Sequence, residues 1–533
     1  MYQILIRNAS VIDGTGKPAF SADVAVKDGK IVLNPDPVLG AEEVIDAAGL
    51  VLSPGFIDAH CHGDSSLGIP EACLAKSSQG ITTECTGQCG ETLFPVSTDP
   101  AKLDMFAGMF AAYLQPDDSG CNEGYADFTS MKKFLEYADR RQCSTNYTIL
   151  TGHSPLRIVA MGFDNREATP EELEHMKSLL RECMEQGSKG LSAGLLYSPS
   201  CYANEDELVE LCKVVAEYDG FFAVHLRDEA GDFENSVKEA IRIAERSGCR
   251  LNLSHHKVCG SEFWGTTEKT LKLVEEANAR GVKTYVDVYP YLATGNYLNI
   301  CLPKDFFAHG PEKMVELLKD PAVRAELTPR IKEMDGRYRQ CGSFDNIFIS
   351  SAPKTPECIG MSVGEYARKV GGDEFEVYYD LVCANGHEAT AAYFSMCAED
   401  LERVLLHPLS VICTDSFDIG PDKACHPRCF GSFPLCLGKY VREQKLMPLK
   451  TMIHKMTQAP AEFMGIANKG VIADGYDADL VLFNPDTVID KADFKNSHTL
   501  SEGIERVFVA GETVFTNGKL TGKFPGKFIP HQK

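Results

Sequence analysis

The chain has 533 residues, of which 44% are hydrophobic and 24% charged, a composition that is typical of a folded globular protein and excludes a fibrous or wholly disordered one. Lys and Arg total 53 against 76 Asp and Glu, so the net charge is −23. This acidic balance has the wrong sign for a protein that binds nucleic acid or an anionic membrane, and we expect neither partner.

No stretch approaches 18 uninterrupted apolar residues, and the first residues lack the basic and then apolar pattern of a secretory signal. The sequence therefore predicts a cytoplasmic protein. Its 20 cysteines are scattered singly, so we interpret most of them as reduced residues of the core.

Both ends of the chain show the same β-rich pattern. Residues 1–54 alternate short strand-like runs with Gly, Asn and Asp turns, and residues 466–533 do the same. We expect the two ends to combine into one small β-sandwich that flanks a larger central domain, residues 55–465.

The central domain alternates apolar strand runs with helical stretches. The strand runs are LVLSPGFIDAHCH, GITTECTG, NYTILTGHS, GSKGLSAGLLY, GFFAVHLRDE, RLNLSHHK, KTYVDVYPY and LSVICTDS. Eight strands separated by helices predict an α/β fold of the (β/α)8 barrel type, the TIM-like barrel. The seventh and eighth runs lie much further apart than one helix requires, which predicts a helical insertion at about residues 300–402.

Polar residues gather where these strands end, which is where a parallel barrel places its active site. They are His60 and His62 on the first strand, Cys89 after the second, His225 on the fifth, His255 on the sixth and Asp415 on the eighth. On an extended H-x-H run both imidazoles point to one side, while the intervening Cys61 points away. Imidazole, thiolate and carboxylate ligands together favour zinc over magnesium or calcium.

Several motifs resemble a known family. PGFIDAHCHGD, the TDS that closes the eighth strand and GVIADGYDADLVLF resemble the amidohydrolase superfamily of metal-dependent hydrolases. TGQCGETLFPV, GHSPLRIVAMG, GSKGLSAGLLYSP, HLRDE, SHHK, DVYPY, HPRCFGSFPLCLGKYVRE and SEGIERVFVAGE resemble its D-aminoacylase, or N-acyl-D-amino-acid deacylase, family, nearly end to end. The resemblance implies a zinc-dependent barrel with a small β-sandwich that hydrolyses the amide bond of N-acyl-D-amino acids.

The resemblance also implies which residues bind the metal. Cys89, His225 and His255 are the implied tight zinc ligands, and His60 and His62 form a weaker second subsite, so one or two metals remain open. Many relatives bridge two metals with a carboxylated lysine after the fourth strand. Lys189 stands at the start of that strand, so we expect Cys89 to take this position, with Cys85 as a second candidate thiol. His256, adjacent to His255 on the strand, is interpreted as a core residue.

The remaining site residues serve catalysis and substrate binding. Asp415 is the predicted general base and acid, which takes a proton from the attacking water and returns it to the leaving nitrogen. By resemblance, Tyr197 donates a hydrogen bond to the acyl oxygen as that oxygen becomes anionic.

A substrate with a free α-carboxylate also requires a cationic pocket. Lys257, expected to face the same way as His255 on an extended strand, Tyr289, and Arg428 in the loop after the eighth strand are the predicted substrate-binding residues. Leu435 stands where the family often has a basic residue, so the preferred side chain stays open.

Two alternatives remain. A cyclic-amide hydrolase of the hydantoinase or dihydropyrimidinase kind would keep the barrel and the metal, but such enzymes usually depend on the bridging lysine, for which Lys189 is poorly placed. A non-catalytic scaffold of the same fold would tend to lose metal ligands, and all of them are present here. The acyl group and the oligomeric state are open.

Overall fold

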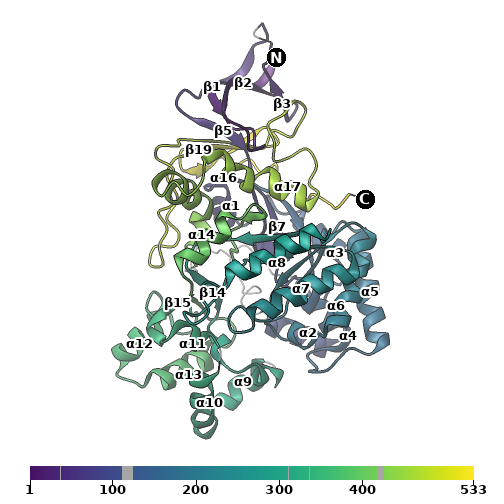
Figure 1. Ribbon diagram of the computed structural model, residues 1–533, viewed down its shortest axis with the longest axis vertical. Coiled ribbons are helices and arrows are strands. Elements are labelled where there is room, and N and C mark those ends of the chain that lie inside the picture. Colours follow the sequence, from purple (N-terminus) through teal and green to yellow (C-terminus); the bar gives the residue numbers. More distant parts are fainter. Residues whose placement is uncertain (37, 111–123, 310, 335, 418–424, 533) are drawn as a thin grey trace.

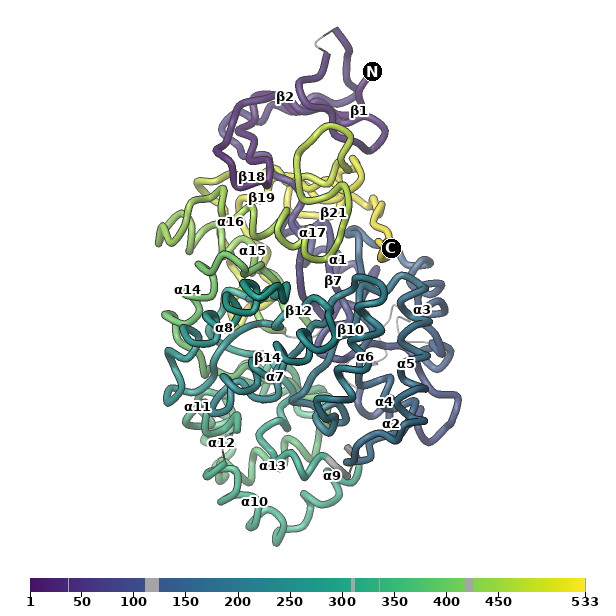
Figure 2. Tube along the Cα trace, turned by 45° about the vertical axis from the view of Figure 1, so that its right-hand side comes forward, coloured from purple at the N-terminus to yellow at the C-terminus, as the bar shows by residue number. Residues whose placement is uncertain are grey.

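The structure is a computed structural model that describes residues 1–36, 38–110, 124–309, 311–334, 336–417 and 425–532. Strands from both ends of the chain lie at one end of the molecule, and helices α9 to α13 lie at the opposite end (Figure 1). The strands and helices between them form the middle of the molecule, as the trace in Figure 2 also shows.

One nine-stranded sheet contains strands from both ends of the chain. Its strands are β1 (Tyr2–Val11), β2 (Phe20–Lys27), β3 (Lys30–Leu33), β4 (Ala41–Asp46), β5 (Val51–Pro54), β18 (Leu480–Phe483), β19 (Ile504–Val509), β20 (Glu512–Thr516) and β21 (Lys519–Leu520). Strands β2 and β3 are joined by Asp28 and Gly29, both with positive φ, which is the tight hairpin turn that such a dipeptide favours. The two ends of the chain meet where β5 pairs with β18.

All eight runs that the sequence marks as central strands form strands. They are β6 (Phe56–Asp58), β7 (Ile81–Thr86), β8 (Asn146–Ile149) with its continuation β9 (Thr151–Gly152), β10 (Gly190–Gly194), β11 (Phe221–His225), β12 (Arg250–Leu253), β13 (Thr284–Val288) and β17 (Ser410–Ile412). They pair in parallel, within the sheets β6-β7-β8 and β9-β10-β11-β12-β13-β17. A backbone hydrogen bond of 3.4 Å from Ala59 N to Ile412 O links the turn after β6 to β17.

Helices follow most of these strands and cover them. They are α1 (Pro70–Ser77), α2 (Pro100–Met109), α3 (Met131–Ala138), α4 (His153–Met161), α5 (Pro170–Glu185), α6 (Glu205–Glu217), α7 (Phe233–Ser247), α8 (Thr267–Ala279), α14 (Ala398–Leu406), α15 (Arg428–Leu435), α16 (Leu449–Met456) and α17 (Gln458–Met464). Helix α5 begins with a capping box between Thr169 and Glu172, with Pro170 in its first turn. Among the described residues, no helix has the length and apolar character that crossing a membrane requires.

The segment between β13 and β17, here called the inserted segment (residues 293–397), has its own hydrophobic core. Its helices are α9 (Pro311–Leu318), α10 (Pro321–Glu333), α11 (Arg337–Cys341), α12 (Val363–Val370) and α13 (Glu374–Asn385). It also contains an antiparallel sheet of β14 (Ala293–Tyr297), β16 (Thr390–Phe394) and β15 (Ile347–Ser351). The prediction of a purely helical insertion was therefore incomplete, because these three short strands lie far apart in the chain and pair only in the folded molecule.

Candidate metal centre

Six side chains converge at the carboxyl ends of the parallel strands. The candidate ligand atoms form three overlapping trios, and within each trio they lie within 4.8 Å of one another: His60, His62 and Cys89; Cys89, His225 and His255; and His60, His255 and Asp415. All six residues are buried. The sequence placed all of them at strand ends, and the structure brings all of them together.

Most of these residues lie just beyond their strands. His225 is the last residue of β11, but β6 ends at Asp58, so the prediction that His60 and His62 stand on the strand was wrong. Their rings still approach each other, with centroids 5.5 Å apart. The Cys61 thiol points elsewhere and donates to Glu84 Oε2.

Three residues of the cluster have a left-handed backbone. The φ angles are 52° at Cys89, 35° at His255 and 48° at Asp415, a conformation that side chains other than glycine adopt at a cost and that is often found at functional sites. Two of these turns are held by hydrogen bonds from their backbone amides. His255 N donates to Asp287 Oδ1 at 2.6 Å, and Asp415 N donates to His60 O at 2.9 Å.

The Cys89 thiol lies at the centre of the cluster. Its Sγ is 3.4 Å from His255 Nε2, 3.5 Å from His60 Nε2 and 3.8 Å from His225 Nδ1. Burial alone raises the pKa of a thiol, but the positive charge that His60 and His255 can carry outweighs burial and holds the pKa of Cys89 well below its usual value. A buried thiolate among imidazoles is a donor set that fits Zn²⁺.

A second carboxylate, Glu229, supports two of the imidazoles from behind. Its Oε1 is 3.3 Å from His255 Nδ1, and its Oε2 is 3.7 Å from His225 Nε2, so each ring presents its other nitrogen to Cys89. Glu229 is itself held by Lys257 and, at 2.7 Å, by Arg337 of the inserted segment. Against the effect of burial, these partners keep the pKa of Glu229 well below its usual value.

Asp287 plays the same part for His60. Its Oδ2 lies 3.2 Å from His60 Nδ1, which leaves His60 Nε2 directed at Cys89 and Asp415. Such outer carboxylates fix the orientation of metal-binding imidazoles. Sequence reasoning missed both Glu229 and Asp287. The available signals were the position of Glu229 four residues after His225 and the place of Asp287 within the last strand before the insertion.

Asp415 connects the imidazoles to a buried arginine. Its Oδ1 is 3.3 Å from Nε2 of both His60 and His62, and its Oδ2 is 2.7 Å from Arg428 Nη1. Although burial opposes ionisation, the Arg428 charge and the imidazoles hold the pKa of Asp415 well below its usual value. Asp415 is therefore a carboxylate at neutral pH.

Arg428 is fully buried as the first residue of α15, at the helix start rather than in the loop that the sequence suggested. Its guanidinium lies 4.7 Å above the Tyr289 ring. Gly295 makes room for it, since a Cβ there would come within 3.0 Å of Arg428 Nη2. Among the described residues, nothing accepts a hydrogen bond from its Nε or Nη2, so these buried donors are available to an anion.

The sequence suggested that Lys257 lies on an extended strand with His255. This was wrong, because β12 ends at Leu253. Its ammonium is nevertheless 2.8 Å from His255 Nδ1 and pairs with Glu229, which makes it part of an internal ion pair. It also lies 5.9 Å from the centre of the Tyr289 ring, on which Arg428 packs as well. The two cations and Tyr289 thus form one side of the site.

Tyr197 follows β10 and reaches the cluster beside His225. Its hydroxyl lies 3.5 Å from His225 Nδ1 and accepts a hydrogen bond of 2.8 Å from Asn296 Nδ2. The orientation of this amide is fixed because Asn296 Oδ1 accepts from Tyr297 N. Desolvation raises the pKa of Tyr197 well above its usual value, so its proton remains available for donation.

Three residues considered from the sequence are not among the candidate ligands. Lys189 precedes β10, and its ammonium donates to Gly465 O and Pro530 O. Cys85 is buried within β7, where Gln88 Nε2 lies 3.4 Å from its sulfur. His256 is hydrogen bonded to Thr270 and packs on Phe233 in the core.

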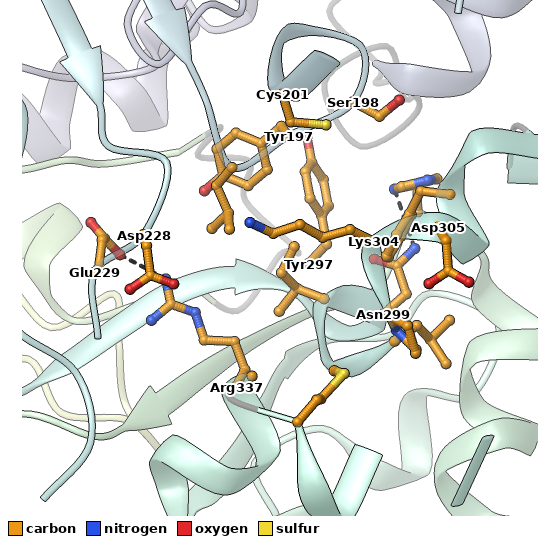
Figure 3. Close-up of a pocket in the computed structure, with 18 of the residues that line it drawn as sticks. Tyr197, Ser198, Cys201, Asp228, Glu229, Tyr297, Asn299, Lys304, Asp305 and Arg337 are labelled. Atoms are coloured by element: carbon orange, nitrogen blue, oxygen red, sulfur yellow. Dashed lines mark hydrogen bonds and ion pairs between the residues drawn. The ribbon is translucent and has the colours of Figure 1, made fainter. Parts of the chain in front are cut away.

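A cavity of about 630 Å³ opens beside the cluster. It shares Glu91, Tyr197, Tyr297 and Arg337 with the smaller pocket in which the candidate metal ligands lie. In Figure 3 the two tyrosines stand between the Glu229–Arg337 pair on one side and Lys304 and Asp305 on the other.

Comparison with known proteins identifies the family of this chain. A model of the amidohydrolase family matches residues 43–329 and 427–515. The chain is 33% identical to N-acyl-D-aspartate deacylase of Alcaligenes xylosoxydans xylosoxydans, over 98% of this chain and 94% of the relative, and 31% identical to D-aminoacylase of the same organism, over 99% and 97%.

A solved relative is the N-acyl-D-glutamate deacylase of Bordetella bronchiseptica, complexed with zinc and a phosphonate inhibitor that mimics the tetrahedral intermediate of the reaction. It superposes with a TM-score of 0.82 at 30% identity over all of both chains. The chain belongs to the amidohydrolase family and is similar along nearly its whole length to the deacylases of N-acyl-D-amino acids.

Proposed function

We propose that this protein is a zinc-dependent hydrolase that cleaves the amide bond of N-acyl-D-amino acids and releases a carboxylate and a free D-amino acid. One observation carries the proposal: a buried cluster of a thiol, four imidazoles and a carboxylate lies beside a buried arginine with unpaired donors. The identity of more than 30% with deacylases along nearly the whole chain supports it.

Cys89, His225 and His255 would hold one zinc tightly, and His60 and His62 would form a weaker second site beside Asp415. The thiol belongs to two of the three trios, which supports Cys89 as the group shared by the two sites. When bound, zinc lowers the pKa of water and polarises the substrate carbonyl.

Asp415 takes the proton from the attacking water and passes it to the leaving nitrogen. Its low pKa keeps it ionised, and Arg428 is the partner that lowers this pKa. Because a substrate carboxylate on Arg428 would compete for the same charge, substrate binding would make Asp415 more basic.

Tyr197 donates a hydrogen bond to the acyl oxygen as negative charge develops there. Two observations support this role: the pKa of Tyr197 is raised, and its hydroxyl oxygen accepts a hydrogen bond from Asn296 Nδ2. Arg428 binds the α-carboxylate, with Tyr289 and Lys257 beside it. The substrate is thus a small molecule with a free carboxylate.

The finer architecture is also proposed. The eight parallel strands close into a (β/α)8 barrel (residues 55–465), with the inserted subdomain at about 300–402, and residues 1–54 and 466–533 form a β-sandwich. The bond from Ala59 to Ile412 supports closure of the barrel. None of the described cysteines is in a disulfide, which supports a reducing compartment such as the cytoplasm.

The test is hydrolysis of N-acetyl-D-amino acids and of their L-enantiomers by the purified protein, before and after a chelator removes metal and zinc is restored. We expect the D-enantiomers to be cleaved, activity to disappear with the metal and activity to return with zinc. Preferential cleavage of a hydantoin would instead favour the cyclic-amide alternative, which the remote position of Lys189 disfavours.

A further inference from the structure

The cavity beside the cluster is lined mainly by two parts of the chain, to which Glu91, Met109 and Phe163 add further contacts. Leu196 and Ser198 follow β10, and Asp228 and Glu229 follow β11, whereas the opposite wall comes from the inserted segment. At about 630 Å³ the cavity lies well inside the size range of small-molecule sites. It is much larger than an acetyl group or an alanine side chain requires.

Much of the lining is apolar. Phe163, Leu196, Ile300, Leu302, Phe307 and Met334 contribute to it. The imidazole of His387 adds no positive charge near neutral pH, because burial lowers its pKa to about 4. A substituent placed here would leave water for a mainly hydrophobic surface.

The charged residues of the lining have an acidic excess. The carboxylates are Glu91, Asp228, Glu229, Asp305 and Glu333, and the cations are Lys304, Arg330 and Arg337. Each cation already has an acceptor, namely Glu229 for Arg337, Asp305 for Arg330 and the Arg227 carbonyl for Lys304. A second carboxylate on the substrate would therefore enter a pocket with an excess of negative charge, which would repel it.

Sequence identity does not distinguish the preferred side chain, because relatives named N-acyl-D-aspartate deacylase, N-acyl-D-glutamate deacylase and D-aminoacylase are 33%, 30% and 31% identical to this chain. We infer that this cavity takes a bulky, uncharged, mainly apolar substituent of the substrate and discriminates against D-aspartate and D-glutamate. The inference rests on the proposed function. Either the amino-acid side chain or the acyl group could supply this substituent, and both have the same chemistry.

Two substrate series distinguish these sources. In one, the acetyl group is kept and the amino acid is D-alanine, D-leucine, D-tryptophan, D-aspartate or D-glutamate. In the other, D-alanine is kept and the acyl group is acetyl, butyryl or hexanoyl. We expect kcat/KM to rise at least about tenfold along one series, since each buried CH2 group contributes about fourfold. The kcat/KM values of N-acetyl-D-aspartate and N-acetyl-D-glutamate should be lower than that of N-acetyl-D-leucine.

A variant that fills the cavity tests its location. Ile300 is half-buried on the wall, and Ile300→Trp should remove most of the advantage in kcat/KM that the bulky substrate has over N-acetyl-D-alanine. The matched control is Leu406→Trp, at an exposed position on α14 outside the lining. It should leave both substrates within about twofold of the wild type.

A second pair of variants tests the charge argument. Asp305 and Glu326 are both exposed carboxylates that pair with Arg330, at 2.7 and 3.9 Å, but only Asp305 lines the cavity. Asp305→Asn should raise the ratio of D-glutamate to D-leucine hydrolysis by about fivefold, the effect of one unit charge about 4 Å away in water. Glu326→Gln should leave this ratio unchanged.

The inference is overturned if N-acetyl-D-alanine is hydrolysed but neither series favours bulk, if D-glutamate is preferred, or if Ile300→Trp and Leu406→Trp behave alike. In these cases the proposed function would stand. If no N-acyl-D-amino acid is hydrolysed at all, the proposed function fails, and this inference fails with it.

Discussion

The cluster of candidate metal ligands and the outer wall of the cavity are built in different ways. The cluster side chains follow parallel strands, whose pairing fixes each strand end against its neighbour, and several of them stand in strained turns. The outer wall comes from helices and short turns of the inserted segment, which packs on a separate core. Chemistry therefore depends on the strand ends, while a segment with its own core can vary the substrate that reaches them.

The two regions meet at Glu229. This carboxylate follows a central strand and supports two imidazoles of the cluster, yet it binds Arg337, which belongs to the inserted segment 108 residues further along the chain. Substitutions in the cluster and in the inserted segment can therefore test the two regions separately.

The largest effect is expected at the cluster itself. Cys89→Ala removes the thiol shared by two ligand trios, so bound zinc should be lost and kcat/KM should fall by at least about 10⁴-fold. His62→Ala is the matched control, since Cys89, His225 and His255 remain, and it should keep most of the tightly bound zinc in elemental analysis. Equal zinc loss in both variants would mean that the two sites are one coupled centre.

Asp415→Asn should give the next largest effect. The substitution preserves the size of the side chain but removes the proton acceptor, so kcat should fall by about 10²–10⁴-fold while zinc stays bound. Steady-state kinetics with parallel metal analysis measures this. A variant with nearly normal kcat would assign proton transfer to another residue.

Arg428→Met should lower kcat/KM for N-acetyl-D-amino acids, because the substrate carboxylate loses its cationic partner. The expected loss of transition-state stabilisation is about 2–5 kcal/mol. The corresponding uncharged amides should lose much less. The acidic limb of the kcat profile should also move to higher pH, since Arg428 lowers the pKa of Asp415 and its removal raises that pKa. Arg428→Lys keeps the charge and should keep the limb near its original position. Parallel losses for acids and amides would make Arg428 purely structural.

The smallest effects are expected where the two regions meet. Glu229→Gln should weaken zinc binding by about 10–100-fold, measured by competition with a chelator, because His225 and His255 lose their outer carboxylate. Arg337→Met should weaken it less, since Lys257 still pairs with Glu229. If Arg337→Met had the larger effect, the inserted segment would contribute to the metal centre as much as the strands do.

The strand-end part of the site was largely predictable from the sequence. Buried parallel strands appear as continuous apolar runs, and a polar residue at or shortly after the end of such a run stands out, as His225 and Asp415 do. The exact strand ends were not predictable, because β6 and β12 stop before His60 and His255 in turns that depend on contacts such as the one from His255 N to Asp287.

The inserted segment was far less predictable. Its strands β15 and β16 are separated by two helices, and their pairing is not expressed in any local pattern. The bond from Arg337 to Glu229 likewise depends on the path of the whole segment. Ion pairs such as those of Lys257 and Arg428 were hidden for the same reason, since the sequence shows the charges but not which carboxylates they meet.

The sheet that joins both ends of the chain has a consequence for synthesis on the ribosome. Lys30 bonds Asp477, 447 residues later, and strand β5 pairs with β18. At about 5–20 residues per second, the edge of β5 waits roughly 20 to 90 seconds for its partner to be made. During that interval an apolar strand edge is open to pairing with other chains. This sheet is completed only after the central strands have been translated, so β5, although it is made before them, is among the last strands to gain its partner.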